Sequence, residues 1–155
     1  MLLSALRSHL FNQVLSRRIS LGHWANPLEG DVFMLRGSHS IFSEALDETL
    51  LQRHAGMDIA STASLYGSGQ NQLSGPALQI EQQVHSEHGE ITSCLDNQDV
   101  KLQMRPLRIV VEDLQYELDT TGKSLQLELR LPAGSYLTSL LDHFIGVTEP
   151  GQGHF

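Results

Sequence analysis

The stretch KSLQLELRLPAGSYLTSLLDHF, residues 123–144, decides the fold of the C-terminal part of the chain. Leucines alternate with polar residues from 125 to 131, which predicts a strand with one apolar face and one hydrated face. Pro132 ends this strand because it has no N–H for a ladder, and Gly134 permits a sharp turn. The Ser135 hydroxyl can then cap a helix. We therefore predict a strand, a tight turn and a helix in succession.

Tyr136 stands at the start of this helix, beside the strand end. A side chain held there can present its ring to a ligand. From the pattern alone, the commoner role is packing under the helix. The helix itself is predicted to bury apolar residues at a spacing of three and four, which are Leu137, Leu140, Leu141, Phe144 and Ile145.

Length and composition indicate an ordinary globular protein. The chain has 155 residues, which suggests one or one and a half domains. Its single cysteine, Cys94, excludes an intramolecular disulfide and suits a reducing cytosol. No apolar run approaches the roughly 20 residues of a membrane span. We therefore expect a cytoplasmic protein that does not associate with membranes.

The charge balance bears on nucleic-acid binding. The net charge of −8 argues against an independent binder of DNA or RNA, because phosphate contacts require cations. A basic surface would have to be local or lie elsewhere. Two groups of basic residues could contribute to a local patch: Arg7, Arg17 and Arg18 in the first helix, and Lys101, Arg105 and Arg108 further along.

The first hundred residues read mainly as helices joined by loops. Helical periodicity predicts a helix over residues 2–21, with Gly22 as its stop. Short strands are expected at 31–35 and 40–42, followed by a helix from 44 to 54 that Ser43 caps. Residues 61–75 are polar and glycine-rich and are interpreted as a surface loop. Helices are predicted over 76–88, with Glu81 facing water, and over 90–97.

From Val100 onward the pattern changes to strands. One apolar run reaches Val111 and is interrupted by Pro106, and a second alternates through Leu114, Tyr116 and Leu118. The turn at 119–123 leads into the strand of the opening stretch. Residues 107–131 thus predict an antiparallel hairpin or meander, covered on one side by the last helix. The fold class is α+β, with a helical and mixed region followed by an antiparallel strand meander and a C-terminal helix.

Two short patterns invite functional readings. Gly67-Ser68-Gly69 resembles part of a phosphate-binding loop, but position 72 is Gln and no lysine follows, so a surface loop is the preferred interpretation. His85 and His88 could approach a metal together with Glu81 or Glu87. Because no third strong ligand is placed by sequence, we predict no metal site.

Two motifs resemble those of a known family. LPAGSYLTSLL is similar to the C-terminal LPAGSFATS motif of the TruD family of transfer RNA pseudouridine synthases, and SALRSHLFNQVLSRRI is similar to the S-A-x-R-S-x-x-F-N helix of that family. The motifs occur in the family's order, and the resemblance extends to about Ile145. It implies that residues 1–104 are the C-terminal part of an inserted domain. Residues 105–145 would be the returning piece of the catalytic domain. The glycine and proline content of residues 146–155 separately predicts a flexible tail.

The resemblance also implies a chemistry. The family isomerises uridine 13 of transfer RNA to pseudouridine without a cofactor, using an aspartate in a G-x-K-D motif and an aromatic ring that contacts the uracil. This sequence has no G-x-K-D motif, so no catalytic residue is assigned, and the chain is expected to begin in the middle of an enzyme and to be inactive alone. The resemblance assigns the uracil-contacting ring to Tyr136. Possible supporting residues are Arg7, Ser8, Asn12, Ser135 and Thr138.

The sequence departs from the family motif at two places. Leu137 replaces the alanine after the aromatic residue, and Asp142 and His143 occupy the positions of an Arg-Glu pair. An arginine replaced by an aspartate reverses a charge that could support the pocket or an RNA phosphate.

Three hypotheses therefore remain open. The chain is a portion of a TruD-like enzyme that works with transfer RNA and with a missing N-terminal catalytic portion or a second chain. Alternatively, it is a truncated, non-catalytic module that binds RNA or protein and exposes a sheet edge and an apolar helix face. The third hypothesis is a metal-binding domain that uses His85 and His88.

Overall fold

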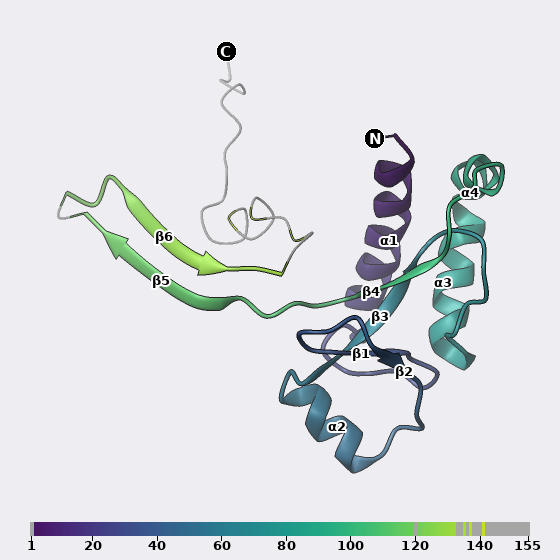
Figure 1. Ribbon diagram of the computed structural model, residues 1–155, viewed down its shortest axis with the longest axis horizontal. Helices are drawn as coiled ribbons and strands as arrows, with labels where there is room; N and C mark the ends of the chain where they lie inside the picture. Colours follow the sequence, from purple (N-terminus) through teal and green to yellow (C-terminus); the bar gives the residue numbers. More distant parts are fainter. Residues whose placement is uncertain (1, 120, 133–134, 136, 138–140, 142–155) are drawn as a thin grey trace. The chain divides into compact units, whose positions relative to one another are not determined.

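The computed structural model describes residues 2–119, 121–132, 135, 137 and 141, and it divides the chain into two units, Met1–Arg108 and Ile109–Phe155. Unit 1 contains helices and a four-stranded sheet, whereas the described part of unit 2 is dominated by a two-stranded hairpin (Figure 1). The predicted α+β class is confirmed. The assignment of residues 1–104 and 105–145 to an inserted and a catalytic domain stays a prediction.

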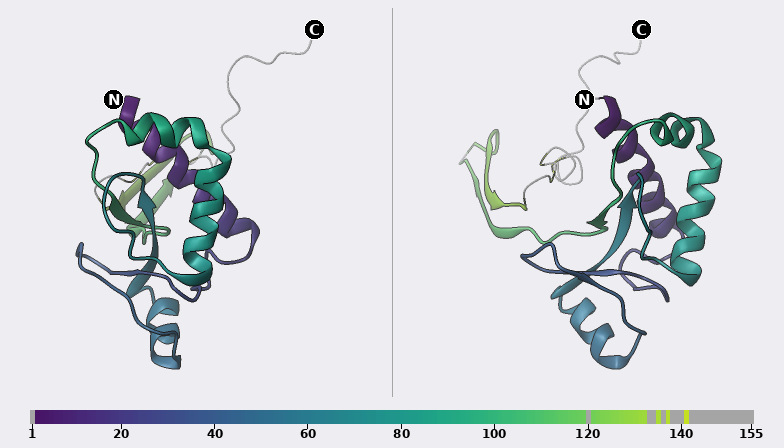
Figure 2. Two further views of the ribbon diagram at one scale, coloured as in Figure 1. Left: turned by 90° about the vertical axis from the view of Figure 1, so that its right-hand side faces the viewer. Right: turned by 45° about the vertical axis from the view of Figure 1, so that its right-hand side comes forward.

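The first helix, α1 (Leu2–Ser20), confirms the helical periodicity of the N-terminal stretch. Its buried face presents Leu10, Phe11 and Val14 to the core of unit 1. The helix ends where the Gly22 N–H donates to the Ile19 carbonyl and Gly22 takes a φ of +77°, a conformation that favours glycine. Figure 2 shows α1 beside α3, with strand β3 adjacent to both.

The sheet of unit 1 has the antiparallel order β2-β1-β3-β4. Its strands are β1 (Phe33–Leu35), β2 (Ile41–Phe42), β3 (Ile59–Leu65) and β4 (Gln103–Pro106). The predicted strands at 31–35 and 40–42 are confirmed in shorter form as β1 and β2, paired through Phe33 and Phe42.

The prediction of a surface loop over 61–75 is wrong for its first five residues, which belong to the inner strand β3. Ser61, Thr62 and Ser64 are buried, and hydrogen bonds satisfy the hydroxyls of Ser61 and Thr62 and the N–H of Ser64. Thr62 Oγ1, for example, donates to the Val32 carbonyl at 2.8 Å. The strand therefore resembles a loop only in its composition of small polar residues.

The second helix, α2 (Glu48–Ala55), begins four residues later than predicted. Asp47, rather than Ser43, is its N-cap, because Asp47 Oδ1 accepts a hydrogen bond from the Leu50 N–H at 2.7 Å. Ser43 instead donates its hydroxyl to the Asp31 carbonyl at 3.4 Å. Leu50 packs with Phe33 and Ile59, so α2 covers the β1–β3 part of the sheet.

Helices α3 (Gly75–Glu87) and α4 (Gly89–Asp96) confirm the two predicted helices, with Ser74 at the N-cap position of α3. The prediction that Glu81 faces water is wrong, because its side chain is completely buried. Strand β1 begins at Phe33, opposite Ser61, so the Ser64 N–H has no β1 partner on that side of β3. Glu81 Oε1 accepts this N–H at 2.6 Å, and Asn71 Nδ2 donates to Oε2 at 2.5 Å.

Close packing explains two glycines. A Cβ on Gly67 would lie 2.5 Å from the Val100 carbonyl oxygen, and a Cβ on Gly30 would lie 2.0 Å from the Ser74 carbonyl oxygen. Gly30 also has a φ of +85°. The Gly67-Ser68-Gly69 segment is therefore shaped by its contact with residues 100–102.

Unit 2 contains the strands β5 (Glu112–Leu118) and β6 (Leu125–Arg130), paired in the register Leu118↔Leu125 and Tyr116↔Leu127. This confirms the predicted hairpin, but the predicted strand over 107–111 is wrong. Pro106 ends β4, the Leu107 N–H donates to the Ser61 carbonyl, and residues 107–111 adopt no strand. The turn at 119–123 is confirmed: Asp119 Oδ1 accepts the Lys123 N–H at 2.7 Å.

Candidate functional site

The residue expected to contact uracil lies in a sparsely described segment. Tyr136 and Thr138 are outside the described residues, as are Leu140, Phe144 and Ile145 of the predicted last helix. Ser135 is half-buried, and its N–H donates to the Pro132 carbonyl at 3.2 Å. The prediction that Leu137 is buried is wrong, because 47% of Leu137 is exposed. The functional role of this segment therefore stays a prediction.

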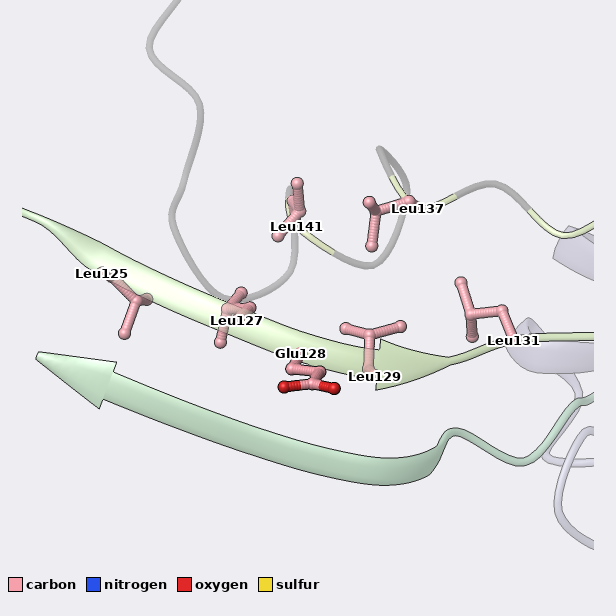
Figure 3. Close-up of a pocket in the computed structure, with 7 residues that line it drawn as sticks. All are labelled: Leu125, Leu127, Glu128, Leu129, Leu131, Leu137 and Leu141. Atoms are coloured by element: carbon pink, nitrogen blue, oxygen red, sulfur yellow. The ribbon is translucent and has the colours of Figure 1, made fainter.

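An open apolar groove of about 580 Å³ adjoins this segment within unit 2. Figure 3 shows Leu129 on β6 and Leu131 just after it directed toward Leu137, while the Glu128 carboxylate lies on the other side of the strand. Such a surface can pack against apolar groups but offers little for acid–base chemistry. The full lining is Leu125, Leu127, Glu128, Leu129, Leu131, Leu137 and Leu141.

The same hairpin exposes large apolar side chains from β5. Leu114, Tyr116 and Leu118 alternate with polar residues along the strand, and Tyr116 and Leu118 are 76% and 60% exposed. Tyr116 lies opposite Leu127 and Leu118 opposite Leu125, so apolar residues of both strands share one face. Because a two-stranded hairpin is marginal in water, this face is suited to packing against further structure.

Among the supporting residues predicted in α1, Arg7 is tied to the protein's own backbone. Its Nε donates to the Tyr66 carbonyl and its Nη2 to the Lys101 carbonyl, both at 2.7 Å, with a longer bond of 3.2 Å to the Leu65 carbonyl. Arg7 thus joins α1 to the end of β3 and to the segment before β4. Ser8 is half-buried and Asn12 is exposed.

Other basic residues of the predicted local patch also make contacts within unit 1. Arg17 pairs with Glu87 at 2.7 Å, and the guanidinium carbon of Arg105 lies 5.0 Å from the centre of the Phe11 ring. Arg18 is buried in an ion pair with Asp31. These contacts explain why basic residues in α1 need not form an RNA surface.

Several aspartates in the described part of the chain have structural partners. Asp47 caps α2 and Asp119 closes the hairpin turn, whereas Asp58 and Asp113 pair with arginines. Asp96 accepts the Tyr66 hydroxyl at 2.7 Å, and this bond together with burial, the larger cause, raises the pKa of Tyr66 to about 12. None of these contacts resembles a free nucleophile, and Asp142 is outside the described residues.

Unit 1 contains a buried polar network that sequence analysis missed. Both oxygens of Asp31 accept from Arg18, at 2.9 and 2.8 Å, and Oδ2 also accepts the Ser61 hydroxyl at 2.8 Å. Ser61 Oγ lies 3.3 Å from Nε2 of buried His54, whose Nδ1 is 2.8 Å from Arg108 Nη2. These five residues are widely separated in the sequence, so no local pattern could reveal the network.

The environment of His54 favours its neutral form. Burial and, to a lesser degree, the Arg108 charge lower the pKa of His54 to about 4, while the Asp31 charge acts in the opposite direction. Because Ser61, His54 and Asp31 are all enclosed, this serine–histidine–aspartate set is not accessible to a substrate. Its chemistry is structural rather than nucleophilic.

His85 and His88 were the candidate metal ligands. The ring of His85 makes an edge contact with Tyr66 at 4.9 Å between centroids, and the ring of His88 makes one with His9 at 5.3 Å. Burial lowers the pKa of His85. Within the part of the chain that the structure describes, no three His, Cys, Asp or Glu side chains are placed to hold a metal ion.

No described helix is both long and apolar enough to cross a membrane.

The sequence model of the family "tRNA pseudouridine synthase D (TruD)" matches residues 1–144. A tRNA pseudouridine synthase D from Pseudoalteromonas atlantica is 39% identical over 99% of this chain, and one from Aeromonas salmonicida is 40% identical over 97%. In both cases the match covers 43% of the relative, so the chain spans less than half the length of these curated proteins.

The fold is also similar to that of a solved tRNA pseudouridine synthase D. A crystal structure from Methanosarcina mazei, assigned as tRNA pseudouridine synthase D, matches with a TM-score of 0.65 and 25% sequence identity. The match covers 91% of this chain and 36% of that protein. With a family match over nearly its whole length, this chain belongs to the TruD family of tRNA pseudouridine synthases.

Proposed function

We propose that this chain supplies the C-terminal portion of an enzyme that isomerises uridine 13 of transfer RNA to pseudouridine. Residues 1–104 would be the C-terminal part of the inserted domain, and residues 105–145 the returning piece of the catalytic domain. The observation that carries this proposal is the family match over residues 1–144. The protein would act in the cytoplasm, on transfer RNA rather than DNA, and without a cofactor.

The exposed face of the hairpin supports the proposal that a further structural portion packs against it. Leu118 and Tyr116 expose more of their surface than is usual for apolar residues in a completed sheet. An N-terminal catalytic portion, on the same chain or on a second one, would cover this face. That portion would also bring the nucleophilic aspartate, for which residues 1–155 have no G-x-K-D motif.

Within this proposal, the Tyr136 ring stacks against the target uracil. Base–aromatic stacking is typically worth about 1–3 kcal/mol, and the base must be held out of its stack for the reaction. Ser135 would help by fixing the turn before Tyr136, since its N–H already closes a turn onto the Pro132 carbonyl.

The experiment measures pseudouridine at position 13 of a transfer RNA transcript by mass spectrometry. The 155-residue chain alone is expected to form none. Addition of the N-terminal portion of the Pseudoalteromonas atlantica relative, ending where its match to this chain begins, is expected to restore formation. Pseudouridine formed by the chain alone would overturn the predicted inactivity, and failure of the mixture would count against the shared enzyme.

Two variants then test the ring. Tyr136→Phe keeps the stacking surface and is expected to retain most of the restored rate, whereas Tyr136→Ala is expected to lower it about 10- to 100-fold, the equivalent of 1–3 kcal/mol. Gln115→Ala is the control, because it truncates an exposed polar side chain of β5 that alternates with the apolar residues of that strand. An equal loss of rate in all three variants would contradict a specific role for Tyr136.

The alternative is a non-catalytic module that binds RNA or protein through its exposed surface. The observation that favours it is the apolar face of the hairpin, since exposed patches of this kind promote association. Light scattering after size-exclusion chromatography tests this alternative. Under this alternative the purified chain self-associates, and Leu118→Lys abolishes the association; a clean monomer would argue against it.

A further inference from the structure

The last two residues of unit 1 are held by three other parts of the same unit. The Leu107 N–H donates to the Ser61 carbonyl of β3 at 2.9 Å, and the Trp24 indole N–H donates to the Leu107 carbonyl at 3.1 Å. Arg108 Nη2 donates to both the carbonyl oxygen and the Nδ1 of His54 on α2. Residue 107 is also part of the apolar core. The chain is thus fixed up to the residue after which unit 2 begins.

The donors and acceptors in the hydrogen bonds made by Arg108 can be assigned in a single consistent way. A guanidinium can only donate, so His54 Nδ1 must accept and the ring proton must be on Nε2. Nε2–H can then donate to Ser61 Oγ, whose own proton goes to Asp31 Oδ2. The same Oδ2 accepts from Arg18. The result is a chain of bonds from the end of unit 1 to its most deeply buried ion pair.

We propose that this chain of hydrogen bonds is a clamp in which neutral His54 holds Arg108, and that Arg108 is a positioning residue that fixes the point where the polypeptide leaves unit 1 toward unit 2. The clamp is defined as Trp24, His54, Ser61, Leu107 and Arg108. It is independent of the proposed enzymatic function, because it depends on contacts within unit 1 alone.

The surroundings of His54 make the clamp depend on its neutral form. The charged groups that act on His54 are Arg108, Asp31 and Arg18, and the ring of Phe33 covers it at 6.2 Å between centroids. Protonation at Nδ1 would remove the acceptor for Arg108 and place two cations together. The clamp is therefore expected to release its arginine in acid and to hold it at neutral pH.

The test uses trypsin, which cleaves after lysine and arginine once the side chain is free to enter the protease. In the full 155-residue chain at neutral pH, we expect the Arg108–Ile109 bond to be cut at least tenfold more slowly than the Lys123–Ser124 bond in the exposed hairpin turn. Mass spectrometry of early time points gives both rates. Similar rates at the two bonds would overturn the proposal.

Two substitutions make this measurement specific. Arg108→Lys keeps the charge and the cleavage site but loses the planar fork, and His54→Gln removes the imidazole acceptor. Each is expected to raise cleavage at bond 108–109 about tenfold relative to bond 123–124. Arg53→Lys is the matched control, because Arg53 lies on the same helix as His54 but forms an exposed ion pair with Asp58. It should leave the ratio unchanged.

A stability measurement separates release of the clamp from unfolding. The urea midpoint of Arg108→Lys should remain close to that of the parent chain, because only the junction is freed. Trp24 is the sole tryptophan, so its fluorescence reports on the clamp directly and should change in Arg108→Lys without a change in far-ultraviolet circular dichroism. An unchanged cleavage ratio with unchanged tryptophan emission would refute the clamp.

Discussion

The side chains of unit 1 and of the described part of unit 2 lie in opposite environments. Every apolar side chain that the structure describes as buried belongs to unit 1, and the same unit encloses Arg18, Asp31, His54 and Glu81 with hydrogen-bond partners. The described hairpin of unit 2 instead exposes Leu114, Tyr116 and Leu118. The contrast shows that the described part of unit 1 has a core of its own, whereas the described hairpin of unit 2 leaves its large apolar side chains exposed.

The largest effect is expected from breaking the buried ion pair of unit 1. Asp31→Ala would leave the Arg18 charge, 3% exposed, without its carboxylate. Loss of one partner of a buried pair typically costs about 3–5 kcal/mol, and urea unfolding followed by Trp24 fluorescence would measure it. Glu87→Ala, which breaks the exposed pair with Arg17, is the control and should cost less than about 1 kcal/mol.

A somewhat smaller loss is expected from Glu81→Leu. The substitution removes the carboxylate that accepts from Ser64 and Asn71, and a buried donor left unpaired costs about 1–3 kcal/mol. Urea unfolding again gives the change in free energy. Glu81→Gln keeps one acceptor oxygen and should recover part of the loss, whereas equal stability of both variants and the parent would contradict the role of Glu81 as the partner of β3.

The pH dependence of unit 1 should follow His54. Because its pKa falls from 6.5 to about 4 on folding, the unfolded state binds more protons between these values. Stability is therefore complete above pH 6.5 and declines as the pH drops toward 4, by about 2–3 kcal/mol from this residue. His54→Gln should flatten this part of the profile, and an unchanged slope in the variant would assign the loss to other groups.

The smallest effect is expected in unit 2. Tyr116→Ser removes a ring that is 76% exposed, and surface substitutions of this kind usually change stability by less than about 0.5 kcal/mol. Thermal unfolding should thus show almost no shift. A loss above 1 kcal/mol would mean that the ring is covered in the isolated chain, and it would weaken the contrast between the units.

Sequence patterns predicted the elements with strong periodicity. The long apolar repeat of α1 and the alternation of Leu125, Leu127 and Leu129 each defined an element to within two residues at either end. Family motifs identified the family because they are long and specific. Strand β3 was missed, since Ser61, Thr62 and Ser64 have the composition of a loop, and the buried hydroxyls of Ser61 and Thr62 find their partners outside β3.

Long-range polar pairing was also beyond the reach of local patterns. Glu81 lies on a helix position that has a polar pattern, and its burial depends on a gap beside β3 that arises because β1 begins only at Phe33, opposite Ser61. Arg18 and Arg108 appeared to be candidates for an RNA surface, yet tertiary contacts direct both into the protein. Tyr136, by contrast, was assigned through the family motif, and its role stays a prediction.

Amide hydrogen exchange tests the difference between the units most directly. In the isolated chain, β3 amides of unit 1 should exchange only through global unfolding, and the β5 and β6 amides should exchange far faster. Addition of the N-terminal portion of the Pseudoalteromonas atlantica relative should slow exchange in β5 and β6 and leave β3 unchanged. Equal protection of β3, β5 and β6 in the isolated chain would contradict the view that unit 2 awaits a partner.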